Sequence, residues 1–212
     1  MSTRSQRRRQ AALPPQRRRN AVAAWVVSAI ALIGIATYAV IASHKVPGAA
    51  VSPTDIKFSP QSAVGTQAKP FSLQTGGVTY SRATLAGRPY LLEIFATWCP
   101  HCQRMTATLK DLRAKVPESR LTMLSVTGSP YAADSTPDNL VPENQQDVNR
   151  FDASYRVTWP TAFDRDLTVA RTWGLTGFPT FYIVNRQGKI VYADSGEPAE
   201  KTLLAALIKA GA

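Results

Sequence analysis

Cysteine is scarce in this sequence, with only two among 212 residues, Cys99 and Cys102. So low a count excludes the small secreted scaffolds that several disulfides hold together. A structural bridge between these two would close a loop of only two intervening residues, and the stabilisation that a disulfide provides grows with the length of its loop. Such a bridge would contribute little, which leaves a redox pair or part of a metal site.

Histidine is equally scarce, since His44 and His101 are the only two. A structural zinc site needs four ligands and a catalytic one usually three. His101 lies between the cysteines and would point away from the face that they share, and His44 is far away in the chain. Metal binding is therefore disfavoured, and we expect no cofactor other than a redox-active Cys99–Cys102 disulfide.

Acidic residues are absent from residues 1–20, which carry seven arginines. The formal net charge is +11, but without these seven arginines 18 basic residues remain against 14 acidic ones. The excess positive charge therefore belongs to a basic tail, which we expect in the cytoplasm. Orientation in a membrane and attraction to anionic lipid explain such a tail without a nucleic-acid partner.

Charge of either sign is missing from residues 21–42. As an α-helix this segment would rise about 33 Å, close to the thickness of a bilayer's hydrocarbon core. It predicts an uncleaved transmembrane helix. A cleaved signal peptide is the alternative, but its apolar region usually runs about 7 to 15 residues. Arginine before the span predicts a single pass through a bacterial inner membrane, with everything after about residue 43 in the periplasm or another extracytoplasmic space.

The remaining chain divides into a linker and one domain. Residues 43–69 contain three prolines and two glycines without a sustained period, which predicts a flexible linker before a folded domain at 70–212. In that domain apolar runs alternate with helical patterns, which predicts an α/β fold with a central mixed sheet flanked by helices. Strands are predicted at 71–73, 78–80, 90–96, 121–126, 160–163, 179–184 and 190–193, and helices at 100–115, 143–155, 166–173 and 197–210.

The setting of the two cysteines favours redox chemistry. Cys99 follows a central apolar strand and begins a helix, whose free N–H groups and dipole stabilise a thiolate. Cys99 is therefore the predicted nucleophile, and Cys102, one turn further on, is placed to attack a mixed disulfide formed at Cys99. Pro100 suits the first helical turn. A protonated His101 would stabilise the thiolate and make the pair more oxidising, and the alternative is an exposed histidine without a role.

Two residues outside the cysteine pair add to this interpretation. Glu93 interrupts the run YLLEIFA, and burial of a carboxyl raises its pKa, so that it could exchange a proton with Cys102 near neutral pH. The alternative is an edge strand that exposes Glu93 to solvent. Pro179 opens an apolar run and cannot donate to a sheet ladder, so we expect it at a strand start, with either a cis Phe178–Pro179 bond or an ordinary trans one.

These motifs resemble the thioredoxin-fold proteins of the membrane-anchored TlpA/ResA family. The matching segments include LAGRPYLLEIFATWCPHC and LTGFPTFYIV, and the resemblance covers nearly all of residues 70–210. In that family the first cysteine attacks, the second resolves, an acid six positions earlier assists proton transfer and the loop proline is cis. The resemblance implies these roles for Cys99, Cys102, Glu93 and Pro179. It also implies that the Phe178 backbone pairs with a substrate segment and that Trp98 shapes the groove.

The resemblance further implies a membrane-tethered thiol-disulfide oxidoreductase whose clients are exported proteins with cysteines. Examples are apocytochrome c and the copper-site proteins of oxidases, served by a membrane thiol-disulfide electron donor or acceptor. The scaffold favours a reductase, whereas the Pro100–His101 dipeptide is typical of DsbA-like oxidases, which remain the alternative. A Sco-type copper metallochaperone needs CxxxC and a distant histidine, and a peroxiredoxin needs Thr or Ser before an isolated cysteine. The chain has neither pattern.

Overall fold

The computed structural model describes residues 59–212. The predicted basic tail, the predicted transmembrane helix at 21–42 and most of the predicted linker lie outside the described residues. Within residues 59–212, no helix combines the length and the apolar character that a membrane crossing requires.

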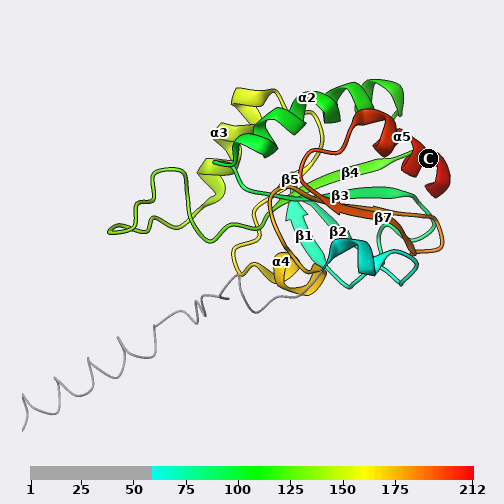
Figure 1. Cartoon of the computed structure of the whole chain (residues 1–212), viewed down its shortest axis with the longest axis horizontal. Coiled ribbons are helices and arrows are strands. Elements are labelled where there is room, and N and C mark those ends of the chain that lie inside the picture. Colours follow the sequence, from blue (N-terminus) through cyan, green and yellow to red (C-terminus); the bar gives the residue numbers. More distant parts are fainter. Residues whose placement is uncertain (1–58) are drawn as a thin grey trace, which may run out of the picture. The chain divides into compact units, whose positions relative to one another are not determined.

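A five-stranded mixed sheet forms the centre of the domain, in the order β5-β4-β3-β6-β7 (Figure 1). The central strand β3 pairs with β4 in parallel and with β6 antiparallel, and β7 continues antiparallel at the edge. The predicted mixed sheet is therefore confirmed. The strands are β3 (Tyr90–Phe95), β4 (Thr122–Thr127), β5 (Thr161–Ala162), β6 (Thr180–Val184) and β7 (Ile190–Ser195).

Helices cover both faces of this sheet (Figure 1). Alternate residues of β3 face opposite sides, so Leu91 packs with α2 and α5 whereas Leu92 and Ile94 pack with α4. All six residues of β3 are buried, as expected for a strand covered on both faces. The helices are α2 (Pro100–Lys115), α3 (Gln145–Tyr155), α4 (Thr168–Trp173) and α5 (Glu200–Ala210).

The N-terminal part of the domain contradicts the predicted linker boundary. The 3-10 helix η1 (Pro60–Ala63) precedes an extended segment that pairs with the sheet edge, where the amide of Gly65 donates to Ile190 at 2.8 Å and that of Ile190 to Thr66 at 2.9 Å. Ala63 and Ala68 are buried. The prediction of a flexible linker up to residue 69 is therefore wrong for residues 60–69, because backbone pairing orders a segment whose composition is typical of a linker.

A small antiparallel hairpin of β1 (Ser72–Thr75) and β2 (Val78–Ser81) follows this segment. Gly76 and Gly77 form its turn, both with positive φ, as the two-residue connection requires. The predicted hairpin is confirmed, and Leu73 joins the core on the α4 side of the sheet.

Candidate active site

The two cysteines lie where the central strand passes into α2. Cys99 is the N-cap residue of α2 and has an extended backbone, and Pro100 occupies the first turn, where its missing N–H group is not needed. Cys102 lies one turn further along. Both thiols are buried, and they share one apolar cluster with Phe95, Ala96 and Phe151. The predicted placing of the pair at a helix start is confirmed.

The loop before β6 lies against Cys99. The Phe178–Pro179 peptide bond is cis, as one of the two sequence alternatives stated. The Cys99 thiol donates to the carbonyl oxygen of Phe178 at 3.7 Å. The Trp98 ring meets the Phe178 ring edge to face, with 5.9 Å between the centroids, and Trp98 remains 39% exposed. The structure thus brings together the predicted nucleophile, the predicted substrate-pairing backbone and the predicted groove residue.

Glu93 lies buried in the middle of β3, so the alternative of a solvent-exposed edge position is wrong. Burial raises the pKa of its carboxyl to about 7, and a hydrogen bond from Ser125 opposes part of that rise. The Ser125 hydroxyl donates to Glu93 Oε2 at 2.5 Å and accepts from Trp159 Nε1 at 2.8 Å. Because the indole can only donate, it leaves the Ser125 proton free to point at Glu93.

The same carboxyl also affects the pKa of the Cys102 thiol. Burial raises the pKa of Cys102 well above its ordinary value, and the negative charge of Glu93 raises it further. Cys102 therefore stays a thiol unless a nearby base removes its proton at the moment of reaction. The effect of the Glu93 charge on the pKa of Cys102 places the carboxyl near this thiol.

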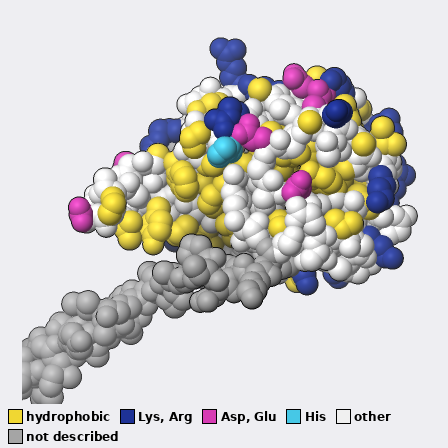
Figure 2. Space-filling view, in the orientation of Figure 1, with side chains coloured by type: hydrophobic (Ala, Val, Ile, Leu, Met, Phe, Trp, Pro, Cys, Tyr) yellow, Lys and Arg dark blue, Asp and Glu magenta, His cyan; other side chains and the backbone are white. Residues whose placement is uncertain are grey.

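His101 is exposed and forms a cluster with Arg104 and Glu197. Its Nδ1 lies 2.5 Å from Glu197 Oε1, and Arg104 binds the same carboxylate through Nε and Nη2. The hydrogen bonds from Arg104 and then His101 lower the pKa of Glu197 to about 2. Among residues 59–212 it is the only histidine, and Figure 2 shows it next to acidic and basic side chains and a hydrophobic area. His101 is thus exposed at the start of α2, as the alternative from the sequence stated, and it has Glu197 and Arg104 as side-chain partners.

Sequence reasoning missed three residues of this site. Ser125 on β4 binds Glu93, Trp159 in the loop before β5 binds Ser125, and Glu197 in the loop before α5 binds His101. Glu197 was expected inside the last helix, which begins only at Glu200. Each of the three contacts its partner across a long stretch of sequence, so no local pattern marks them.

Metal ligands do not gather at the site. Within residues 59–212 no group of three or more His, Cys, Asp or Glu side chains is arranged to hold a metal ion. The described side chains can exchange protons, and the two thiols can exchange electrons by forming a disulfide.

Comparison with known proteins identifies relatives of this arrangement. The family model described as Redoxin matches residues 63–207. The thiol-disulfide oxidoreductase ResA of Halalkalibacterium halodurans is 25% identical over 138 residues, covering 65% of this chain and 71% of that protein. ResA of Bacillus subtilis is 25% identical over 140 residues, with 66% and 71% covered. ResA of Bacillus thuringiensis is 21% identical over 117 residues, with 55% and 60% covered, so this chain spans less than two thirds of that relative.

Solved structures show the same fold at lower sequence identity. A candidate thiol:disulfide interchange protein DsbE from Chlorobium tepidum superposes with a TM-score of 0.58 at 19% identity, covering 70% of this chain and 99% of that one. A thioredoxin-like protein from Aeropyrum pernix gives 0.55 at 20% identity, with 66% and 89% covered. At such identities the likeness establishes the fold, which is thioredoxin-like.

Proposed function

This chain belongs to the Redoxin family, as a thioredoxin-like protein of the TlpA/ResA type, and from that membership we propose that it is a thiol-disulfide oxidoreductase. Its reactive groups are Cys99 and Cys102, and its substrates are disulfides in exported proteins. One observation carries the proposal. Cys99 begins α2 with its sulfur against the carbonyl of Phe178, so an extended client segment that pairs with this backbone would present its sulfur to Cys99.

The reaction proceeds in two exchanges. The Cys99 thiolate attacks one sulfur of the client disulfide, the other client sulfur leaves as a thiolate, and a mixed disulfide forms. Cys102 then attacks Cys99 Sγ, the second client sulfur leaves, and the Cys99–Cys102 disulfide closes. The client gains two electrons and the protein loses two.

Proton transfer from Cys102 is the role that we propose for Glu93. With a pKa of about 7, its carboxyl is ionised in about half of the molecules near neutral pH and is then a base. The raised pKa of Cys102 makes such a base necessary, because the thiol alone would supply little thiolate.

Reduction of clients is the direction that we propose, with a DsbA-like oxidation as the second candidate. The Pro100–His101 dipeptide favours oxidation, since a protonated His101 stabilises the Cys99 thiolate. Glu197 beside His101 offsets part of that effect, although Arg104 pairs with the same carboxylate, and the resemblance to the TlpA/ResA family favours reduction. A reduction potential of the purified protein near that of thioredoxin, about −270 mV, would support a reductase, and one near that of DsbA, about −120 mV, would support an oxidase.

We also propose that residues 21–42 tether the protein to a bacterial inner membrane with the catalytic domain outside. The support is the uncharged span after an arginine-rich tail. Client proteins such as apocytochrome c or the copper-site proteins of oxidases, and a membrane electron donor or acceptor, would be the partners. These partners rest on the resemblance to the TlpA/ResA family.

A trapping experiment tests the function. Replacing Cys102 with Ala removes the resolving thiol, so Cys99 should stay linked to clients as mixed disulfides. We expect adducts with exported proteins that a reducing agent dissolves, detected on non-reducing gels of cell extracts. The matched control is the double variant Cys99→Ala and Cys102→Ala, which should give none. If the single variant gives no adducts either, the proposal is wrong.

A further inference from the structure

The segment between β4 and α3, residues 129–143, forms an ordered ribbon that we call the arm. It protrudes from the end of the sheet where α3 lies (Figure 1). Backbone hydrogen bonds join its two sides, from Ala132 to Val141 at 2.8 Å and in both directions between Thr136 and Asn139. The sequence predicted only a loop here. These backbone hydrogen bonds give the arm a fixed conformation beside the active site.

Both ends of the arm bind the two residues that precede Cys99. At one end, Trp98 Nε1 donates to the Ser129 hydroxyl at 2.9 Å. At the other end, Glu143 Oε1 accepts from the backbone amide of Thr97 at 3.1 Å and from its hydroxyl at 2.5 Å. Glu143 is buried, so these bonds are shielded from water. The arm is therefore positioned by the turn that carries the nucleophile.

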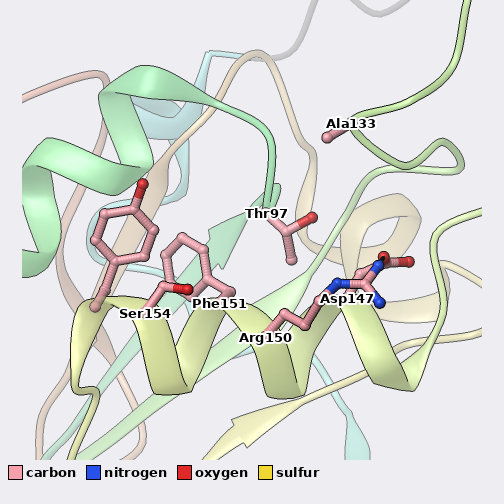
Figure 3. Close-up of a pocket in the computed structure, with 7 residues that line it drawn as sticks. Thr97, Ala133, Asp147, Arg150, Phe151 and Ser154 are labelled. Atoms are coloured by element: carbon pink, nitrogen blue, oxygen red, sulfur yellow. Dashed lines mark hydrogen bonds and ion pairs between the residues drawn. The ribbon is translucent and has the colours of Figure 1, made fainter.

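A pocket of about 180 Å³ lies between the arm and α3 (Figure 3). Ala133 of the arm and Thr97 of the active-site turn line it, and the α3 side includes Phe151, Ser154 and Tyr155. Pockets for drug-sized ligands and cofactors usually measure about 300–1,000 Å³. This pocket is smaller and therefore suits a single side chain.

Two aromatic residues of the lining, Phe151 and Tyr155, connect the pocket with the apolar cluster around the cysteines. The Phe151 ring lies 4.7 Å from the Tyr155 ring and 4.9 Å from the Phe95 ring, measured between centroids. Phe151 also packs in the same apolar cluster as Cys99 and Cys102. The walls of the pocket are thus continuous with the reactive centre.

The charged groups at the pocket neutralise each other. Arg150 pairs with Asp147 one turn earlier on α3, and the second oxygen of Asp147 accepts the backbone amide of Asn144 at 2.8 Å. No charge in the lining is left to select an ionic ligand. The remaining lining combines apolar contact, from Ala133, Phe151 and Tyr155, with the uncharged hydroxyls of Thr97 and Ser154.

We propose that this pocket receives one aromatic or large aliphatic side chain of the client, close in sequence to the cysteine that Cys99 attacks. The inference rests on the proposed function. Thr97, two residues before Cys99, forms part of the pocket wall. An extended client spans about 3.3 Å per residue, so a side chain within a few residues of its cysteine reaches the pocket. Exposed Tyr131 and Leu140 on the arm extend the apolar surface, which Figure 2 shows along the protruding part.

The test uses two peptides in mixed disulfide with glutathione, identical except for Phe or Ser two residues from the cysteine. Reduced full-length protein in detergent attacks the peptide sulfur, glutathione leaves as a thiolate, and Cys102 then releases the reduced peptide. Oxidised glutathione serves as a substrate that cannot fill the pocket. We expect the second-order rate constant to be about tenfold higher for the Phe peptide, the effect of burying much of one aromatic ring.

Pocket-filling variants complete the test. Ser154→Phe should remove the preference for the Phe peptide and leave the rate with oxidised glutathione unchanged. Ala153→Phe is the matched control, because Ala153 is also exposed on α3 but does not line the pocket, and it should retain the preference. Ala133→Trp fills the pocket from the arm and replaces Ser154→Phe should that variant not fold.

The outcomes separate the two proposals. Equal rates of the wild-type protein with both peptides, or equal slowing of both by the filling variants, would overturn the pocket inference and leave the oxidoreductase function intact. A wild-type protein that reacts with neither peptide nor with oxidised glutathione would overturn the proposed function itself.

Discussion

At the scale of single residues, burial and an uncharged neighbour set the pKa of the Glu93 carboxyl. Desolvation raises its pKa to about 7, and the hydrogen bond from Ser125 keeps that pKa from rising further. Cys102 on α2 is the titratable group near Glu93. Ser125 on β4 binds the carboxyl, and Trp159 in the loop before β5 binds Ser125. The pKa of Glu93 therefore depends on the Ser125 hydroxyl, and the indole N–H of Trp159 orients that hydroxyl toward Glu93.

Ser125→Ala should move the pH dependence of the resolving step to higher pH. The variant loses a hydrogen bond that favours the ionised carboxylate, so the pKa of Glu93 should rise above about 7, by about one unit. The measurement is the rate at which Cys102 displaces a model thiol from Cys99, taken across pH 5 to 9. Ser125→Thr keeps the hydroxyl and should keep the profile, and Glu93→Gln should lose the inflection. An unchanged profile in Ser125→Ala would show that Ser125 only fills space.

Glu197 is the residue through which the charge near Cys99 can be altered without touching the cysteine pair. Glu197→Gln should make the protein more oxidising, because the positive charge of Arg104 would then act on the Cys99 thiolate without compensation. Arg104 and Glu197 are exposed, so solvent screening limits the shift to about 20 mV or less.

The reduction potential against glutathione measures this effect. Glu200→Gln is the matched control, because Glu200 pairs with Lys115 at the other end of α2 and should leave the potential unchanged. A more reducing Glu197→Gln protein would mean that the cluster acts on Cys99 in some other way than by charge.

At the scale of elements, the start of the domain has a larger structural role than its composition suggests. Residues 60–69 contribute two buried alanines and three backbone hydrogen bonds to the β7 edge and the turn before it. Burial of small side chains and net hydrogen-bond gains of about 1 kcal/mol each make such a segment a measurable part of the stability.

Truncation at two points should reveal this contribution. A chain that begins at Ser59 should melt close to the midpoint of one that begins ten residues earlier. A chain that begins at Pro70 loses η1 and the edge pairing, and its midpoint should fall by about 5–10 °C. Thermal unfolding followed by circular dichroism distinguishes these results, and equal midpoints for all three chains would contradict the role of residues 60–69.

At the scale of the whole molecule, most of the domain could be predicted because its elements carry strong local patterns. The continuous apolar run at 90–96, the helix beginning at Pro100 and the hairpin at Gly76-Gly77 lie where the sequence placed them. The errors lie where pattern is weak. Residues 60–69 have a linker-like composition, and the arm has neither helical nor alternating periodicity, although backbone pairing orders both.

The sequence by itself determined which groups could carry the proposed chemistry. Two cysteines separated by two residues at a helix start, an acid within a buried strand and a proline at a strand start are local facts, and each constrains its own surroundings. Tertiary structure alone decided which residues adjust the pKa values of the reactive groups and which segments lie around them. Ser125, Glu197 and the two ends of the arm lie between 31 and 96 residues from the groups that they contact. Contacts over such separations depend on sheet order and helix packing, which no local pattern encodes.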